Sequence, residues 1–344
     1  MSGRRRSSRP WELLIYLAPL PILIGSLFVG PSESVRPTDV LHWFQTQLLP
    51  SGSEGAVEQI DPVVEAVILQ VRMPRVLLAF LVGAALTVAG SALQAFFRNP
   101  LVSPYILGLS SGSAFGAALA LTAPILPLLP SAFFFGLLAV GLTYFLAITR
   151  QGVSTLSLIL SGIIITGVFT ALLTIVQYLT DPFKLQTIVH WTMGNLHNAN
   201  WSKVRSATLP ILIGILWLYL LRWRMNVISL GDEETRAVGL NPQRERLLVL
   251  FPATLVASAA VAVAGVIGMV GLAVPHMVRM LVGPDNQKVQ PVSFSLGGCF
   301  LVLVDDVSRT IASFEIPIGV FTVLVGGPFF VYLLKRGRMS YGGT

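Results

Sequence analysis

Charged residues are scarce in this 344-residue sequence: they make up 11% of the chain, whereas hydrophobic residues make up 54%. Soluble globular proteins contain roughly 25% charged residues. The scarcity therefore excludes an ordinary soluble domain and indicates a protein embedded in a membrane. Because the apolar runs are long and continuous, they favour membrane-spanning helices over the short alternating strands of a barrel.

Cysteine and catalytic patterns are lacking as well. The only cysteine is Cys299, which excludes an internal disulfide and a cysteine-rich metal site. The four histidines form no two-histidine metal motif at helical spacing, so we expect no metal site. Asp305 and Asp306 are adjacent in sequence, and adjacent helical residues point in different directions, so they cannot form a facing acid pair. A membrane enzyme is therefore disfavoured.

A phosphate-binding Gly-Lys-Ser/Thr loop is also missing, so we expect that the chain cannot drive transport with ATP by itself. The net charge of +7 does not point to nucleic acid, because no basic cluster is interleaved with aromatic residues. In a membrane protein, Lys and Arg instead mark the loops that face the cytoplasm. The charge is therefore evidence about topology.

Ten apolar runs are each near the length that crosses a hydrocarbon core. They predict an all-α, polytopic membrane protein with about ten transmembrane helices, both termini cytoplasmic, in the cell (inner) membrane. The predicted spans are 13–29, 74–97, 105–122, 126–148, 154–179, 206–222, 247–264, 266–282, 290–312 and 317–334.

The distribution of Lys and Arg predicts on which side of the membrane the segments around the spans lie. Residues 1–10 form a basic cytoplasmic N-terminus before an uncleaved first span, and residues 11–336 form the transmembrane domain. Residues 31–65 contain one Lys or Arg only, so we expect an outer, solvated connecting loop. Residues 223–246 form a polar cytoplasmic loop, and residues 337–344 form a cytoplasmic tail.

Three arginines break this topology. Arg72, Arg75 and Arg309 fall on the outer side, close to membrane level, although most of the 23 Lys and Arg residues fall inside. Asp305 and Asp306 precede Arg309 by four and three residues, so intrahelical ion pairs are expected. A second interpretation is that Arg309 is held at the outer surface to receive an acidic partner, and the two interpretations are compatible.

Small residues and stop signals organise the region around residues 72–120. Arg98-Asn99-Pro100 is expected to end the second span, because proline lacks a donor and disfavours helix in the residue before it. Small residues then recur every fourth position, which predicts a helix face that another backbone can approach closely. They are Gly108, Gly112, Gly116 and Ala120.

The loop 223–246 predicts a short amphipathic helix over about 231–238. Ser229 and Asp232 are spaced like a capping box, and Gly239 with Asn241-Pro242 supplies stop signals. The helix is either a structured connector or a docking helix for a soluble subunit that carries the missing motor. In the loop 181–205, His190 and His197 are either ordinary surface histidines or contacts for a metal chelate.

The chain resembles the FecCD-type permeases of ABC importers for iron–siderophores, haem and cobalamin. The order and spacing of the motifs match from about residue 72 to residue 336. They are Arg72-Met-Pro-Arg75, Gly83-Ala-Ala-Leu86, Gly90, Gln94, Arg98-Asn-Pro-Leu101, Leu107-Gly108, Gly271-Leu-Ala-Val-Pro-His276, Arg279, Gly283-Pro-Asp285, Asp306, Arg309, Glu315-Ile-Pro-Ile-Gly319 and Gly326-Gly-Pro-Phe-Phe330.

This resemblance implies a homodimeric permease with a pathway along the dimer axis, lined by the spans 154–179 and 317–334. Two cytoplasmic ATPase subunits would bind ATP and Mg²⁺, and this chain would hold no cofactor. They would dock on a coupling helix made of Gly231, Asp232, Glu233, Glu234, Thr235, Arg236, Ala237, Val238 and Gly239.

The resemblance also implies an extracytoplasmic substrate-binding protein whose acidic residues dock on Arg72, Arg75 and Arg309. Arginine suits this role because it pairs bidentately with carboxylate. A second aspartate before Arg309 departs from the family pattern and would weaken docking. A cytoplasmic gate is implied at Gly152, Val153, Ser154 and Thr155.

The function expected from these observations is import by alternating access. Polar residues lie on or near one face of an otherwise apolar pathway span, namely Thr166, Thr170, Thr174 and Gln177, which suits a bulky, weakly bound chelate. Iron–siderophore or haem is the first expectation for the cargo, cobalamin the second, and an oxyanion such as molybdate a remoter one. A passive channel, which would need neither ATPase nor docking helix, is the remaining alternative of another class.

Overall fold

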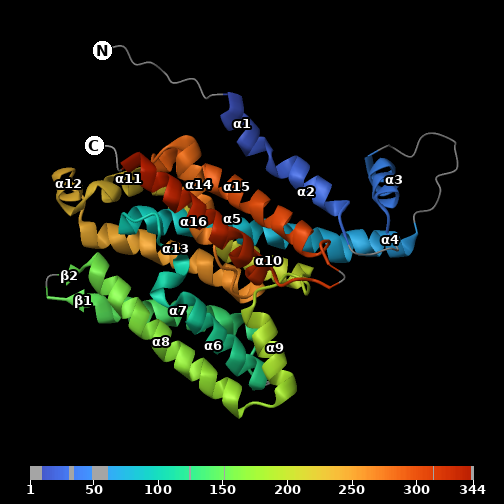
Figure 1. Ribbon diagram of the computed structural model, residues 1–344, viewed down its shortest axis with the longest axis horizontal. Coiled ribbons are helices and arrows are strands. Elements are labelled where there is room, and N and C mark those ends of the chain that lie inside the picture. The colour runs from blue at the N-terminus through green and yellow to red at the C-terminus, as the bar shows by residue number, and fades with distance from the viewer. Residues whose placement is uncertain are drawn as a thin grey trace.

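The computed structural model describes residues 10–30, 35–48, 61–123, 125–150, 152–312 and 314–341, and the part that it describes is mainly helical (Figure 1). The first third contains α1 (Pro10–Leu17), α2 (Pro19–Leu27), α3 (Pro37–Leu48), α4 (Pro62–Ala66), the π-helical turn η1 (Val67–Arg72) and α5 (Met73–Phe97). The middle contains the 3₁₀-helix η2 (Pro104–Leu107), α6 (Leu109–Thr122), α7 (Leu128–Ala147), β1 (Ile148–Thr149), β2 (Gly152–Val153), α8 (Thr155–Leu179) and α9 (Pro182–Thr192). The last part contains α10 (Trp201–Leu220), α11 (Arg222–Leu230), α12 (Asp232–Ala237), α13 (Pro242–Ala264), α14 (Val270–Val282), α15 (Asn286–Ser308) and α16 (Ile318–Tyr341).

The predicted all-α membrane fold is confirmed. Among the described residues, 6 helices are long and apolar enough to cross a membrane: Pro62–Phe97, Leu128–Ala147, Thr155–Leu179, Trp201–Leu220, Pro242–Ala264 and Asn286–Ser308. Four shorter apolar helices occupy the other predicted positions: Leu13–Leu27, Leu109–Thr122, Val270–Val282 and Ile318–Pro328. The count of ten spans and the cytoplasmic placement of both termini stay predictions. Residues 1–9 and 342–344 lie outside the described residues.

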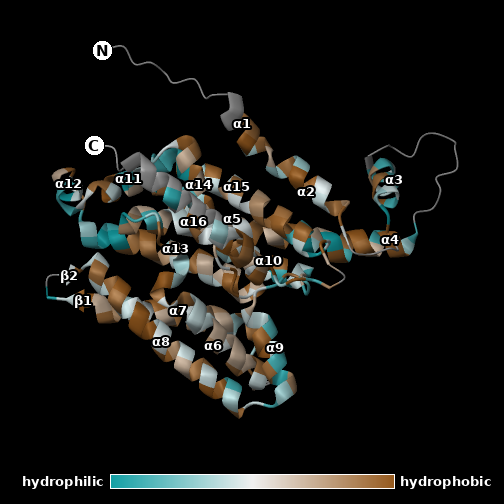
Figure 2. Ribbon diagram, in the orientation of Figure 1, coloured by the Kyte–Doolittle hydropathy of each residue, from teal (hydrophilic) through white to brown (hydrophobic). Residues whose placement is uncertain are grey.

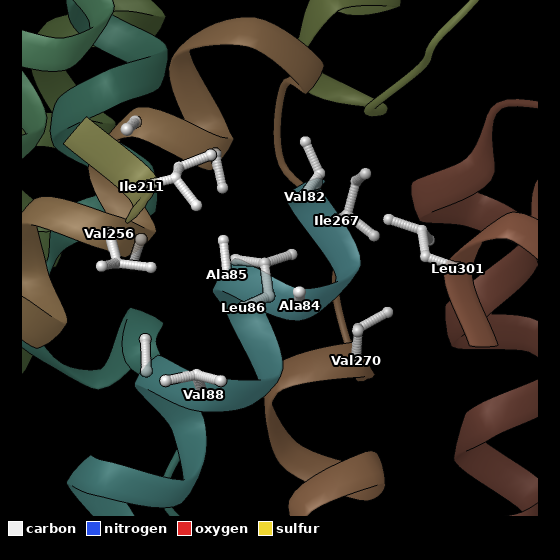
Figure 3. Packing of buried hydrophobic residues seen from close by; sticks show 14 of the residues in the cluster. Val82, Ala84, Ala85, Leu86, Val88, Ile211, Val256, Ile267, Val270 and Leu301 are labelled. Carbon is white, nitrogen blue, oxygen red and sulfur yellow. The ribbon is translucent and has the colours of Figure 1, made fainter. Parts of the chain in front are cut away.

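Helix α5 lies at the centre, between α10, α13, α14 and α15 (Figure 1). Figure 3 shows Leu86 and its α5 neighbours among side chains from these helices, including Val256 of α13 and Leu301 of α15. Small residues permit this crowding, because a Cβ at Gly90 would overlap the carbonyl oxygen of Gly271 on α14. At the far end, Arg98 adopts φ 53 and ends α5 at the predicted stop.

Helices α6, α7, α8 and α9 lie together on one side of this centre (Figure 1). The predicted small-residue face of α6 is confirmed: a Cβ at Gly112 would overlap the Phe135 carbonyl oxygen, and one at Gly116 would overlap that of Ser131, both on α7. Gly108 lies outside the helix, because its φ of 80 starts α6 after the 3₁₀ turn.

Two predicted loops are partly helical. The connector 31–65 contains α3 and α4, and the second apolar helix begins at Pro62 rather than at residue 74. Asp61 caps α4 by accepting from the Val63 N–H, and the π-helical turn η1 carries the helix past Pro74, which lacks a donor. The outer loop 181–205 contains α9 and the first turn of α10.

Candidate functional site

Apart from the pathway residues on α8, the functional residues predicted from sequence lie at two opposite ends of the molecule (Figure 1). One end carries α12 and the β1–β2 hairpin, and we call it the α12 end. The other carries η1, the start of α5 and the chain after α15, and we call it the arginine end, after Arg72, Arg75 and Arg309. Figure 2 shows hydrophilic residues on α12 and at the start of α13, whereas α7 and α8 are largely hydrophobic.

At the arginine end, Arg75 is buried between two carboxylates. Its Nε atom donates to Asp305 Oδ2 at 2.9 Å and its Nη1 atom donates to Glu315 Oε1 at 2.8 Å. The Asp305 side chain is 1% exposed, whereas that of Glu315 is 36% exposed. The Arg75 guanidinium is therefore already bonded to two carboxylates. Of these two, Glu315 is the one that solvent reaches.

Arg309 caps the C-terminal end of α15 and forms the predicted intrahelical ion pairs. Its Nη2 atom donates to Asp306, and its Nε atom lies 3.8 Å from Asp305 Oδ2. The same nitrogen Nη2 also donates to the Ser26 carbonyl at 3.1 Å, which ties α15 to α2. The prediction that Asp305 and Asp306 pair with Arg309 is confirmed.

The Arg72 side chain donates hydrogen bonds to backbone carbonyls instead of to a carboxylate. It donates to the Leu27 carbonyl at 2.8 Å and to the Val35 carbonyl at 3.0 Å. Arg72, Arg75 and Arg309 are 3%, 7% and 3% exposed, so their guanidinium groups are not displayed on the surface of this structure. The docking role of these three residues stays a prediction.

His190 and His197 also lie at the arginine end. Their rings meet edge to face with 4.7 Å between centroids, and they line a cavity of about 310 Å³ together with Arg75 and Glu315. Burial, and after it the neighbouring His190, holds the pKa of His197 below its ordinary value. Among the described residues, no group of three or more His, Cys, Asp or Glu is placed to hold a metal ion.

At the α12 end, a helix forms where the coupling helix is predicted. Helix α12 runs from Asp232 to Ala237, and residues 231–239 end in Gly239 at φ 80. The expected capping box is wrong, because the N-cap is Gly231 and Ser229 lies inside α11, where its hydroxyl donates to the Asn226 carbonyl. Acidic residues nonetheless fill the first turn, where the helix dipole favours them.

The predicted gate segment 152–155 forms the second strand of a small hairpin and the start of α8. Ile148 pairs with Val153 and Thr149 with Gly152, and Ser154 caps α8 by accepting from the Ser157 N–H at 3.0 Å. Gly152 adopts φ 98, a conformation that glycine tolerates best. The gating role stays a prediction.

Contacts between the hairpin and α12 run through the first turns of α13. Gln243 receives the Val153 N–H at 3.1 Å and donates to the Val153 carbonyl at 3.3 Å. Arg246 donates to the same carbonyl and to both carboxylate oxygens of Asp232, each at 2.8 Å. Arg98 adds a second contact to Asp232 at 3.3 Å.

These roles of Gln243 and Arg246 were not predicted from the sequence, which places Arg246 in a polar cytoplasmic loop. A signal exists in the sequence: Asn241-Pro242 starts a helix, and the spacing of three places residues 243 and 246 on one face. The partnership of Arg75 with Asp305 and Glu315 joins positions at least 230 residues apart, and local sequence carries no signal for it.

The predicted pathway residues lie on helix α8, which is largely uncovered. Thr170 and Thr174 are exposed, and Thr166 and Gln177 are partly exposed. The Thr174 hydroxyl donates to the Thr170 carbonyl at 2.9 Å. The structure therefore places these polar groups on an accessible face, and their pathway role stays a prediction.

Residues 17–336 match the model of the FecCD transport family. The chain belongs to the FecCD transport family. This membership confirms the resemblance drawn from the sequence motifs, and it makes the chain a membrane permease of the ABC importer class, with several membrane-spanning helices.

Three relatives show how far the similarity of this FecCD permease extends. It is 42% identical over 288 residues to the molybdate import system permease protein MolB of Haemophilus influenzae, covering 82% of this chain and 86% of that protein. It is 40% identical over 273 residues to a probable iron chelatin transport system permease protein of Helicobacter pylori, covering 79% and 83%. A solved structure described as an inward-facing conformation of an ABC transporter assigned to the metal-chelate type is 36% identical, with a TM-score of 0.82 and coverage of 95% and 99%.

Proposed function

We propose that this FecCD permease forms a homodimer in the cell (inner) membrane and imports an iron chelate, a siderophore complex or haem, by alternating access. The observation that carries the proposal is the separation of two polar sites by an apolar helical body: α12 at one end and the buried arginine end at the other. Two cytoplasmic ATPase subunits, which bind ATP and Mg²⁺, dock on α12. A substrate-binding protein docks at the arginine end.

In this proposal, the second copy of the chain in the homodimer supplies the other half of the transport pathway. Helix α8 is as apolar as the central helix, yet only 22% of its most apolar window is buried. Its exposed threonines include Thr174, whose hydroxyl donates to the Thr170 carbonyl, but a hydroxyl oxygen can still accept a hydrogen bond, which water supplies and lipid tails do not. These threonines suit an aqueous pathway between two copies, where a chelate is held weakly enough to leave.

The relatives described above point to two cargo classes. The Helicobacter pylori permease is named for an iron chelatin, and the similar solved structure is assigned to the metal-chelate type. The Haemophilus influenzae permease is named for molybdate, so an oxyanion is the second candidate. Cobalamin, an organometallic chelate of similar bulk, is a further alternative within the family.

The test is ATP-dependent uptake in proteoliposomes that hold this chain with its ATPase subunit. Ferric siderophore, haem, cobalamin and molybdate are offered separately, each with a matching binding protein. We expect uptake of a ferric chelate only when ATP and the binding protein are both present. Uptake of molybdate alone would select the second candidate, and uptake without ATP or binding protein would establish a passive channel.

Docking requires a separate test, because the arginines are buried and bonded. Replacing Arg75 with Glu would place like charges beside Asp305 and test folding instead of docking. Glu315→Gln removes the solvent-accessible carboxylate from Arg75 and retains its shape. If Arg75 receives a carboxylate of the binding protein, this change should tighten binding severalfold, by roughly 1 kcal/mol.

The matched control for this docking test is Glu65→Gln, an equal change of charge at an exposed position on α4. Equal effects of the two variants would indicate long-range electrostatic attraction instead of a contact with Arg75.

A further inference from the structure

The N-terminal part of α13 holds one buried arginine that contacts both predicted moving segments of the α12 end. The Arg246 side chain is 7% exposed, although it carries a charge. Its Nη2 atom donates to both oxygens of Asp232, the first residue of α12. Its Nη1 atom donates to the carbonyl of Val153 in β2. One planar guanidinium therefore joins the helix and the hairpin.

The helix that carries Arg246 is held firmly in place. Helix α13 packs against α5 and α10, and 78% of its most apolar window is buried. Gln243, one turn earlier, binds both the N–H and the carbonyl of Val153, as a neighbouring strand would. The start of α13 thus positions the backbone of β2 directly.

The space around the link is hollow. A cavity of about 760 Å³ lies between the hairpin, α12 and α13, and its lining includes Gly152, Ser154, Asp232, Arg236 and Arg246. Where apolar side chains fill the space between two elements, packing transmits a displacement. Across a polar cavity, the charge-assisted hydrogen bonds from Arg246 Nη2 to both oxygens of Asp232 are the stiffer connection.

We propose that Arg246 is the coupling residue of this permease: it transmits a displacement of α12, through Asp232, to the carbonyl of Val153 and so to segment 152–155. The inference rests on the proposed function, in which an ATPase subunit moves α12 and segment 152–155 opens and closes the pathway. Arginine is suited to the task, because its fixed fork holds two acceptors at once, whereas a lysine ammonium is a single point charge.

The experiment measures gate movement and transport separately. The buried thiol is removed by Cys299→Ser, and Ser154→Cys reports gate movement through its rate of reaction with N-ethylmaleimide, with and without ATP. Cargo taken up per ATP hydrolysed is measured in parallel, with ferric chelate as the probe. The variants, made in the full chain assembled with its ATPase subunit, are Arg246→Met and Arg246→Lys.

The matched control is Arg244→Met, an equal substitution two residues earlier at an exposed position. We expect Arg246→Met to keep the ATPase rate within about twofold, to abolish the effect of ATP on labelling, and to lower cargo per ATP about tenfold, inside the range of measured couplings. Arg246→Lys should be intermediate, and Arg244→Met should behave as the parent protein.

Unchanged cargo per ATP and unchanged ATP-dependent labelling in Arg246→Met would overturn the inference. If Arg246→Met does not fold, Asp232→Asn decides, because it leaves Arg246 bound to Val153 and weakens the connection to α12; Arg98→Met, which removes the other contact of Asp232, is its control. A full effect of ATP on labelling in Asp232→Asn would also overturn it. If the parent protein takes up no cargo, the proposed function is contradicted instead. The two failures can be told apart, because labelling at residue 154 does not depend on the choice of cargo.

Discussion

Helices α5 and α8 have the same length and nearly the same hydropathy, yet they occupy opposite environments. The most apolar window of the helix Pro62–Phe97, which ends in α5, has a mean hydropathy of 2.3 and is 89% buried. That of α8 has a mean hydropathy of 2.4 and is 22% buried. Hydropathy therefore identifies a membrane helix without saying whether protein or lipid surrounds it.

The difference between the two helices lies in the size and spacing of their side chains. Gly83 and Gly90 of α5 meet backbone atoms of α15 and α14, so neighbouring helices approach it on several sides. In α8, bulky Ile163, Ile164 and Leu160 point outward and are 53–60% exposed. Small residues permit close helix packing in a membrane. Large branched side chains on the outer face of a helix instead contact lipid or a second copy of the chain.

The largest expected effect comes from the buried ion pair between Arg75 of α5 and Asp305 of α15. Arg75→Met leaves Asp305 buried without its main partner, and we expect a loss of about 3–5 kcal/mol in the free energy of unfolding. Thermal unfolding in detergent measures it. Combining Arg75→Met with Asp305→Leu should recover much of the loss, and a double variant as unstable as the single one would contradict this account.

A substitution of glycine sharpens the comparison directly. Gly90→Ala in α5 places a methyl group onto the Gly271 carbonyl, so we expect a loss of about 1–3 kcal/mol. Gly167→Ala in α8 is the control, because the new Cβ would meet nothing within 4 Å besides the backbone of its own helix and its chain neighbours. It should be neutral or stabilise the helix by about 0.5–1 kcal/mol. Equal losses in the two variants would show that burial does not distinguish these helices.

Acidification tests the solvent-accessible partner of Arg75. Burial opposes ionisation of Glu315, but the hydrogen bond and charge of Arg75 outweigh it and hold the pKa of Glu315 below its ordinary value of 4.5. The stability that this pair contributes is therefore present above pH 4.5 and is lost as the pH falls through the lower folded-state pKa. Because Glu315 is partly exposed, we expect about 0.2–1 kcal/mol.

The measurement for this prediction is the difference in unfolding temperature between the wild type and Glu315→Gln, followed from pH 7 down to pH 3.5. Protonation of His197, whose charge also favours the ionised form of Glu315, adds to the difference as the pH falls from 7 to about 5. Below pH 4.5 the difference should shrink as Glu315 itself takes up a proton. A difference that keeps growing below pH 4.5 has the wrong sign and would refute the assignment.

The smallest effect is expected on the outer face of α8. Ile164 is 58% exposed, so Ile164→Ala should change the stability of the monomer by less than about 0.5 kcal/mol. Unfolding of the monomer and the monomer–dimer ratio are measured together. A loss of about 2–5 kcal/mol in the dimer alone, typical of a buried Ile→Ala change, would show that a second copy covers this face.

Much of the architecture was predictable from sequence, because membrane helices have strong local signals. Long uncharged runs located the spans, Arg98-Asn99-Pro100 marked the end of α5, and the break near Gly265 separates α13 from α14 as predicted. The start of the second span was not predictable, because a π-helical turn carries the helix past Pro74.

The candidate sites were predictable in position but not in environment. The sequence singled out Arg72, Arg75 and Arg309 as exceptions to the charge rule, and it located α12. It predicted surface arginines, whereas the structure buries them, because Asp305, Glu315 and the backbone of α2 supply partners from distant parts of the chain. The sequence also places Arg246 on one helix face with Gln243, but not beside Val153, which lies 93 residues away.

The amino-acid sequence by itself determined the membrane class, the family and the helical segments of this protein, since hydropathy, helix-ending residues and motif spacing are local properties. Tertiary structure alone decided which of two equally apolar helices lies at the centre, and which charges are buried. Helix position and charge burial both depend on which backbones approach each other and which ion pairs form. The ion pair of Arg75 with Asp305, for example, joins residues 230 positions apart in the sequence.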